Sequence, residues 1–204
     1  MYQDIVASLY NRSSIIDLVR ETAERIFIPL TVGGGIRTID DIQNLLRAGA
    51  DKVCINTAAV ARPEFITEAA NIFGSQCIVV GIEAIRQGDG PWKAFCDNGR
   101  EHTGFDAFDW ARRAVDLGAG ELLLTSVDRE GTRKGFDVDF IRKVTAAVNV
   151  PVVAHGGAGS VSHLAEVAAC NVDGVAIASM LHYHNATIFD LKSGLSDLGV
   201  EVRS

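Results

Sequence analysis

The stretch Ile28-Pro29-Leu30-Thr31-Val32-Gly33-Gly34-Gly35-Ile36 is an apolar run that breaks into three glycines. A similar stretch, Pro151-Val152-Val153-Ala154-His155-Gly156-Gly157, lies 151 − 29 = 122 residues further along the chain. With the same offset and no gap, the register also pairs Asp17 with Asp139, Arg20 with Arg142, Asp51 with Asp173 and Ile55 with Ile177. A register that holds without insertion over so many positions indicates an internal repeat.

Around this repeat, short β-branched runs alternate with amphipathic helical patterns. Strands are predicted at residues 2–6, 29–32, 53–56, 77–83, 122–127, 152–154 and 175–178. Helices are predicted at residues 14–25, 38–49, 63–73, 105–117, 137–147, 161–170 and 188–198. Residues 84–103 are predicted to form an irregular excursion or hairpin near a site. The strands are too apolar for a sheet with one solvent-exposed face, and this favours a parallel sheet covered by helices on both faces or closed into a barrel.

Both an open doubly wound sheet and a closed (β/α) barrel fit this alternation. Two tandem halves of four units close naturally into eight strands, so the repeat favours an α/β (β/α)8 TIM barrel of duplicated half-barrels. The second half contains four predicted strands, but the first contains only three, because the counterpart of the strand ending at Glu83 would end at 83 − 122 = −39. We therefore expect residues 1–204 to form one barrel domain of seven strands, without its N-terminal βα unit and with unpaired edges at strands 2–6 and 175–178.

Composition limits the classes of function. The chain has 204 residues, of which 48% are hydrophobic, and no apolar run near the roughly 18 residues that span a bilayer. Without a signal-like start, we expect a cytoplasmic protein that does not associate with membranes. The net charge of −7 argues against nucleic-acid binding. Cys54, Cys77, Cys96 and Cys170 lack CxxC spacing and are expected to be reduced core thiols; no metal and no cofactor is expected.

The duplicated glycines predict binding of two phosphate groups. In a barrel, Gly34 and Gly35 would lie just beyond the carboxyl end of a strand, and Gly156 and Gly157 would lie beyond its half-turn partner. Glycine allows backbone N–H groups to approach an anion closely. The following strands end in Asn56-Thr57 and Ala178-Ser179, which offer further donors. The alternative is that these glycines serve only tight turns.

Polar residues at the ends of strands are the candidates for chemistry: Asp4, Glu83, Thr125, Asp128 and His155. Glu83 follows an apolar run, where burial raises the pKa of a carboxyl toward the range of an acid or base catalyst. The alternatives are that Glu83 pairs with Arg86 and that His155 is a hydrogen-bonded structural residue. At the opposite ends of strands, Lys52 and Glu121 are charges for which exposed capping is the simplest interpretation.

Several motifs together resemble the cyclase subunit of imidazole glycerol phosphate synthase. They are Thr31-Val32-Gly33-Gly34-Gly35-Ile36, Gly49-Ala50-Asp51-Lys52-Val53, Ile55-Asn56-Thr57-Ala58, Phe73-Gly74-Ser75-Gln76, Gly118-Ala119-Gly120-Glu121, Leu123-Leu124-Thr125-Ser126 and Asp128-Arg129-Glu130-Gly131-Thr132. The resemblance covers essentially the whole chain. It implies a duplicated half-barrel that receives ammonia from a glutaminase partner and acts on a bis-phosphorylated ribulosyl formimino aminoimidazole carboxamide ribotide. The expected products are imidazole glycerol phosphate and the carboxamide ribotide.

The resemblance also implies roles for individual residues. Phosphate-binding positions of the family match Gly34, Gly35, Asn56 and Thr57 at one end and Gly131, Gly157, Ala178 and Ser179 at the other. The family's ammonia gate at the barrel floor includes the positions of Lys52 and Glu121, and Asp51 falls where the glutaminase docks.

Three departures from the family pattern leave the acceptor open. The family has paired catalytic aspartates; the first would lie in the absent unit, and Glu83 stands at the second position. In addition, Val6 and His155 replace a threonine and a serine of the usual site. One alternative is a paralogous branch that delivers ammonia to a nucleotide-linked sugar for amidino groups of surface polysaccharides. Another is a truncated barrel that catalyses nothing.

Overall fold

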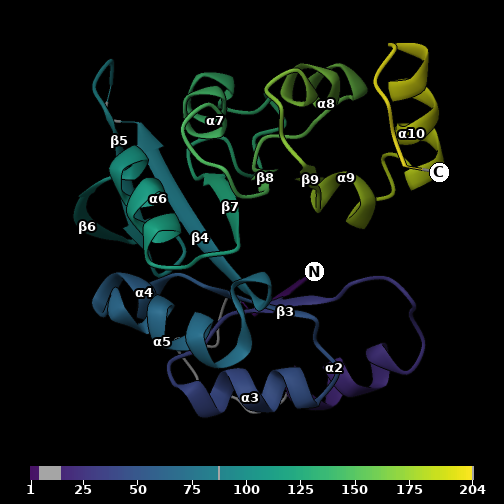
Figure 1. The fold of residues 1–204 in the computed structure, drawn as a ribbon. Coiled ribbons are helices and arrows are strands. Elements are labelled where there is room, and N and C mark those ends of the chain that lie inside the picture. The colour runs from purple at the N-terminus through teal and green to yellow at the C-terminus, as the bar shows by residue number, and fades with distance from the viewer. Residues whose placement is uncertain (5–14, 87, 204) are drawn as a thin grey trace.

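The computed structural model of this protein describes residues 1–4, 15–86 and 88–203. Parallel strands form a curled sheet in the spatial order β1-β2-β3-β4-β7-β8-β9, with the antiparallel hairpin β5–β6 attached to β4 (Figure 1). The strands are β1 Tyr2–Gln3, β2 Thr31–Gly33, β3 Lys52–Ile55, β4 Ile78–Arg86, β5 Trp92–Cys96, β6 Glu101–Asp106, β7 Glu121–Ser126, β8 Val152–His155 and β9 Gly174–Ala176. The order of the parallel strands follows the chain, as the barrel hypothesis predicts.

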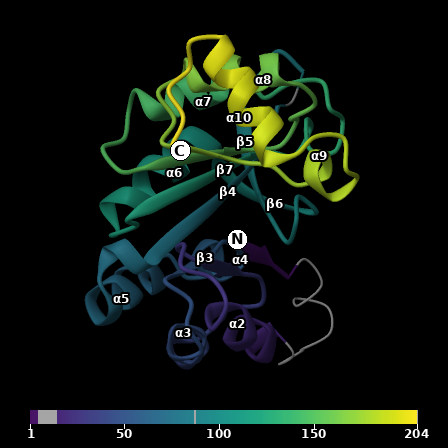
Figure 2. The same ribbon diagram turned by 90° about the vertical axis from the view of Figure 1, so that its right-hand side faces the viewer.

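The helices cover the outer face of the curled sheet. They are α2 Ile15–Ala23, α3 Ile39–Arg47, α4 Thr57–Ala61, α5 Glu64–Phe73, α6 Ala107–Asp116, α7 Val138–Thr145, α8 Val161–Ala168, α9 Ser179–His182 and α10 Ile188–Asp197, with a 3-10 turn at Ser75–Cys77. Figures 1 and 2 show α2, α3 and α5 on one side of the molecule and α7, α8 and α10 on the opposite side, with the strands between them. Large side chains such as Phe65, Trp110 and Phe140 are buried between helices and sheet. No helix within the described ranges is long and apolar enough to cross a membrane.

The structure confirms the (β/α) barrel-type class, with seven parallel strands in the described part of the chain. The predicted strand at residues 2–6 is described only as far as Asp4, and residues 5 and 6 lie outside the described residues. Among the described strands, β1 and β9 stand at the two ends of the spatial order, as expected from the uneven halves.

Three expectations need correction. Strand β4 does not end at Glu83 but continues to Arg86, because β5 pairs with residues 83–86 in antiparallel register. The last strand ends at Ala176, and Ala178 is the N-cap of the short helix α9. Cys96 is buried with Cys54 and Cys170, whereas Cys77 is half-buried; all four cysteines are free.

The repeat is visible in the local structure of both halves. The Leu30 N–H donates to Asp51 Oδ2 at 2.7 Å, and the Val152 N–H donates to Asp173 Oδ2 at 2.9 Å. Each aspartate lies in the loop before the next strand, and its carboxylate accepts a hydrogen bond from the start of the preceding strand. Helix α3 begins at a capping box formed by Thr38, and Ser160 caps α8 at the equivalent position.

Candidate functional site

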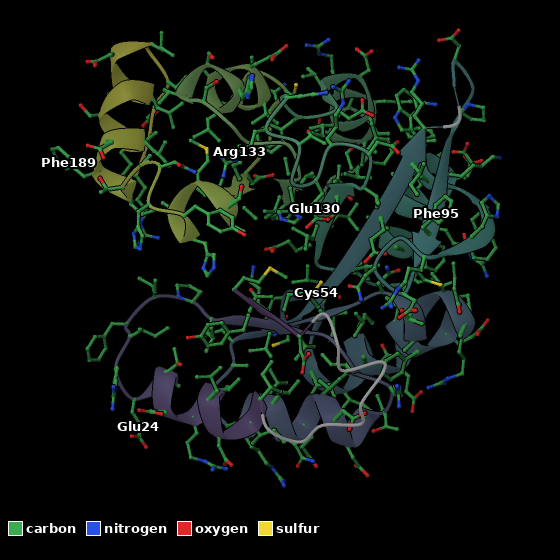
Figure 3. All side chains as sticks on the ribbon, turned by 180° about the vertical axis from the view of Figure 1, so that it is seen from behind. Glu24, Cys54, Phe95, Glu130, Arg133 and Phe189 are labelled. Carbon is green, nitrogen blue, oxygen red and sulfur yellow. The ribbon has the colours of Figure 1, made fainter. Side chains whose placement is uncertain are left out.

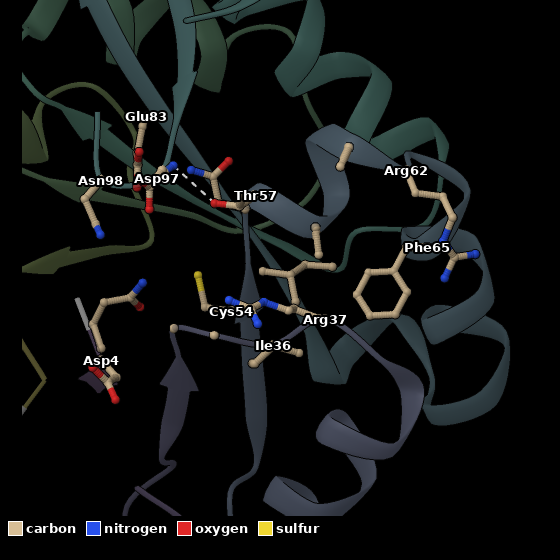
Figure 4. Close-up of a pocket in the computed structure, with 17 residues that line it drawn as sticks. Asp4, Ile36, Arg37, Cys54, Thr57, Arg62, Phe65, Glu83, Asp97 and Asn98 are labelled. Carbon is tan, nitrogen blue, oxygen red and sulfur yellow. Dashed lines mark hydrogen bonds between the residues drawn. The ribbon is translucent and has the colours of Figure 1, made fainter. Parts of the chain in front are cut away.

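Two adjoining cavities open at the carboxyl ends of the strands. The first, of about 350 Å³, is lined by the loop after β2 and by the start of α4, and the second, of about 510 Å³, extends across β7, β8 and β9. Both cavities share Gln3, Cys54, Asn56, Glu83 and Asn98 in their lining. Figure 4 shows Glu83, Asp97 and Asn98 on one side of the first cavity and Ile36 and Arg37 on another. Glu83 therefore faces both cavities from the middle of the sheet.

The first glycine loop closes the far end of the first cavity. Gly34 and Gly35 have φ values of +97° and +70°, in the left-handed region that favours glycine. A Cβ on Gly34 would lie 2.2 Å from the Asp4 carbonyl oxygen. Asn56 and Thr57, at the start of α4, line the same cavity together with Arg37 and Asp4. Any side chain at Gly34 would clash with the backbone of Asp4, so the position requires glycine, and the space beside the loop stays open to a ligand.

The second glycine loop repeats this backbone beside a smaller cup of about 120 Å³. Gly156 and Gly157 have φ values of +93° and +107°, and a Cβ on Gly157 would lie 2.1 Å from the Gly135 carbonyl oxygen. The N-cap residues of α9 and α4, Ala178 and Asn56, have nearly equal dihedrals: φ −124°, ψ −69° and φ −135°, ψ −77°. The cup is lined by Glu130, Gly131, His155, Gly156, Gly157, Ala158, Ala176, Ile177, Ala178 and Ser179. All four residues that were predicted to bind the second phosphate therefore line this one cup.

Glu83 is a half-buried carboxyl held by the tip of the hairpin. The Gly99 N–H donates to Glu83 Oε2 at 2.7 Å. Burial raises the pKa of the Glu83 carboxyl, whereas hydrogen bonds from Gly99 and Asn56 oppose this rise. The Arg86 guanidinium lies 4.7 Å from the centre of the Trp92 ring instead of pairing with Glu83. A carboxyl in this state is suited to take up and release a proton at a bound ligand.

The sequence predicted an excursion or hairpin near a site, and the structure places the tip of this hairpin at the first cavity. Asp97, Asn98 and Gly99 have φ values of +51°, +58° and +75°, and the Asp97 N–H donates to Thr57 Oγ1 at 3.1 Å (Figure 4). A Cβ on Gly99 would lie 2.6 Å from Val127 Cγ1, so the tip packs tightly against the end of β7. The sequence Asp-Asn-Gly is a turn signal that marks this tip, but nothing in it indicates contact with Glu83.

His155 lies between the second cavity and the second cup, and it lines both. In the parallel register Glu83 pairs with Thr125, and Thr125 pairs with His155, which places the three residues in one row across β4, β7 and β8. Thr125 Oγ1 lies 3.3 Å from His155 Nδ1, and Glu130 Oε1 lies 4.0 Å from His155 Nε2. Figure 3 labels Glu130 and Cys54, which line the second cavity from the loop after β7 and from β3.

Cys54 lines both cavities but remains a thiol. Burial, followed by the charges of Glu83 and Glu121, raises the pKa of Cys54 to about 12. The thiolate is the nucleophilic form, so Cys54 is not an activated nucleophile. Within the described part of the chain, no group of three His, Cys, Asp or Glu side chains is placed to hold a metal ion.

Other predicted site residues lie outside the cavities. Asp128 Oδ2 accepts the Arg86 N–H at 2.7 Å, and Asp128 does not line either cavity or the second cup. Lys52 and Glu121 start β3 and β7, at the opposite end of the sheet, and their side chains form an ion pair. Because β4 separates these two strands, the pair bridges the inner face of the sheet. The Lys52 side chain is 31% exposed and that of Glu121 is 14% exposed, so the pair is more than a solvated cap.

The fold and the site define a class of protein: a (β/α) barrel-type chain of two repeated halves, with matched glycine cups and a half-buried carboxyl between them. The family described as Histidine biosynthesis protein matches residues 1–187, and the chain belongs to this family. It is 50% identical over 202 residues to the imidazole glycerol phosphate synthase subunit HisF of Gluconacetobacter diazotrophicus, a match covering 99% of this chain and 78% of that protein. It is 48% identical over 208 residues to the same subunit of Mycobacteroides abscessus, covering 99% of this chain and 81% of that protein.

Proposed function

We propose that the chain is an ammonia-using cyclase subunit that converts a bis-phosphorylated ribulosyl formimino aminoimidazole carboxamide ribotide to imidazole glycerol phosphate. The observation that carries this proposal is the pair of glycine cups on either side of Glu83, which suits a ligand with a phosphate at each end. The names of the two relatives support the same reaction. The chain is 50% and 48% identical to these two relatives, and this similarity favours the cyclase reaction over transfer of ammonia to a nucleotide-linked sugar.

In this proposal the cups position the substrate. Gly34, Gly35, Asn56 and Thr57 bind one phosphate; Gly131, Gly157, Ala178 and Ser179 bind the other. Backbone N–H groups and the Ser179 and Thr57 hydroxyls are the donors. Fixing both ends of a flexible ligand places its central atoms against Glu83 and removes much of the entropic cost of reaction.

Glu83 moves protons at the centre of the bound substrate. Ammonia addition and ring closure require protons to leave nitrogen and to reach the departing group, and a carboxyl with a raised pKa serves in either direction. The Gly99 N–H stabilises the ionised form and orients the carboxylate toward the cavities. Thr125 and His155 continue the same row of side chains beyond Glu83.

The opposite end of the sheet provides the entry for ammonia. The Lys52–Glu121 ion pair crosses the inner face there. In this proposal, a change of conformation in one of the two side chains opens or closes a passage to the cavities. We propose that a glutaminase subunit docks at this end, near Asp51, and forms a cytoplasmic heterodimer with the chain. The bond from Leu30 also gives Asp51 a role in holding β2. The described strands belong to one barrel domain in this proposal.

The test is turnover by the purified chain in an ammonium salt, with the bis-phosphorylated ribotide as substrate and imidazole glycerol phosphate detected by mass. Product from the wild type and roughly 10²-fold less from Glu83→Gln are expected, since loss of an acid–base group typically costs this much or more. His102→Asn, which alters neither cavity, serves as the matched control. No product from the wild type, or product only with a nucleotide-linked sugar, contradicts the proposal.

A further inference from the structure

The two cups differ in the charges that surround them. Arg37 and Arg62 line the first cavity, together with the carboxylates of Asp4, Glu83 and Asp97. The residues around the second cup, all within the described part of the chain, include neither lysine nor arginine. Its ionisable side chains are His155 and the carboxylate of Glu130. A dianion in the second cup therefore has one candidate cation among the lining residues, and one carboxylate to repel it.

His155 occupies a position that has no side chain in the first half. The offset 155 − 33 = 122 pairs it with Gly33, where a Cβ would lie 2.2 Å from Gln3 Oε1. The contact of Nδ1 with Thr125 Oγ1, at 3.3 Å, fixes the ring. Nε2 is thereby turned toward Glu130, whose Oε1 lies 4.0 Å away. The imidazole is thus held with one nitrogen presented at the cup.

We propose that His155 is the cationic contact of the second cup, and that Nε2 exchanges the Glu130 carboxylate for a phosphate-like dianion when the cup fills. The inference rests on the proposed function, in which this cup holds one phosphate of the substrate. The cup of about 120 Å³ is large enough for one tetrahedral anion. The Glu130 side chain is 52% exposed, so its carboxylate has solvent to turn into when the anion arrives.

Exchange of this kind makes the second cup sensitive to pH. An imidazolium donates a charge-assisted hydrogen bond to an anion, which is about twice as strong as a neutral one, and imidazole changes charge around neutral pH. The other charged groups lining the second cavity are Met1, Glu83, Arg100 and Glu130, while β9 contributes none. Arginines keep their charge throughout this range. Anion affinity at the second cup should therefore fall with rising pH, and this fall should depend on His155.

Inorganic sulfate is the probe of choice, because it remains a dianion across this pH range whereas phosphate does not. Amide NMR signals of Gly34 and Gly35 report on the first cup, and those of Gly156 and Gly157 report on the second. Between about pH 5.5 and pH 8.5 we expect the dissociation constant at the second cup to rise roughly tenfold, which corresponds to one charge-assisted bond.

Two variants test the residue itself. At pH 5.5, His155→Asn should weaken sulfate binding at the second cup about tenfold and abolish its pH dependence, whereas His102→Asn should bind as the wild type does. Glu130→Gln changes an exposed side chain that the fold does not need, and it should strengthen binding at the second cup by removing the competing carboxylate. Sulfate binding at the second cup that is unchanged in His155→Asn or in Glu130→Gln, or a pH dependence there that His155→Asn leaves intact, overturns the inference.

The outcome is separable from that of the proposed function. Sulfate binding that depends on His155, in a chain without turnover of the ribotide, removes the cyclase proposal and leaves the anion contact standing. If the wild type turns over the ribotide normally and His155→Asn binds sulfate at the second cup as well as the wild type does, only the proposed role of His155 is contradicted.

Discussion

The two glycine cups share a backbone but differ in their side chains. Gly34 and Gly156 have φ values of +97° and +93°, and the N-cap residues that follow one strand later have nearly equal dihedrals. Yet arginines line the first cavity, whereas the second cup has His155 and Glu130. In the proposed function, the repeat thus preserves the backbone that receives a phosphate, while the side chains around that phosphate differ.

The largest expected effect concerns Glu83, which stands between the cups and for which the described chain has no repeat partner. Glu83→Gln should lower kcat by about 10²–10⁴-fold without weakening sulfate binding at either cup. Steady-state kinetics and amide titrations measure the two quantities. If Glu83→Gln lost both sulfate binding and turnover, Glu83 would be needed for the structure of the cups rather than for proton transfer.

The same variant should change stability with a defined sign. Burial raises the pKa of Glu83 above its ordinary value of 4.5, so the folded chain binds this proton more tightly than the unfolded chain. The contribution of Glu83 to stability therefore falls as pH rises from 4.5 through the folded-state value. Glu83→Gln should consequently increase the free energy of unfolding at pH 7, in contrast to the exposed control Glu166→Gln. Denaturant unfolding at pH 4 and pH 7 measures this difference.

The next effect compares the glycines directly. Gly34→Ala and Gly156→Ala both impose a strained φ, which costs about 1–3 kcal/mol. The added Cβ would lie 2.2 Å from the Asp4 carbonyl oxygen in the first case and 2.8 Å from that of Ser126 in the second, so Gly34→Ala should destabilise more. Gly104→Ala is the control, since it has φ +82° and nothing within 4 Å of its Cβ. Denaturant unfolding should give the order Gly34, Gly156, Gly104.

The paired aspartates should behave alike, because their hydrogen bonds are alike. Asp51→Ala and Asp173→Ala each leave a strand-starting N–H without its carboxylate, which costs about 1–3 kcal/mol. Equal losses in the free energy of unfolding are expected. A difference above about 1 kcal/mol between the two losses would mean that the two hydrogen bonds do not contribute equally to stability.

The smallest effect concerns the helix caps. Thr38 and Asp41 form a reciprocal capping box, whereas Ser160 Oγ accepts the His163 N–H at 3.3 Å and shares a hydrogen bond with Ser162 Oγ at 2.7 Å, with no reciprocal bond to the cap backbone. Thr38→Ala should therefore cost about 1–2 kcal/mol, and Ser160→Ala should cost about 0.5–1 kcal/mol. Thermal unfolding of the two variants decides the order, and a larger loss for Ser160→Ala would contradict the comparison.

Features that follow from periodicity were predictable from the sequence. The 122-residue offset located both glycine loops, and apolar runs located all seven parallel strands. The short helices α4 and α9 were missed, because five and four residues are too few to show a helical period. The extension of β4 to Arg86 was missed as well, since it depends on pairing with β5.

Contacts across the site were not predictable for a different reason. The Gly99 N–H reaches Glu83 from 16 residues away, through the conformation of a hairpin tip. Glu130 approaches His155 from another loop. Single-sequence patterns describe each loop separately, whereas these contacts depend on how the sheet curls and brings the loops together.

The most direct test of the account is whether one ligand fills both cups. The chain is titrated with the bis-phosphorylated ribotide in the absence of ammonia, and the amides of Gly34, Gly35, Gly156 and Gly157 are followed by NMR. The account predicts that all four signals shift together, with a single dissociation constant and one ligand per chain. Shifts confined to one cup, or separate midpoints for the two cups, would contradict it.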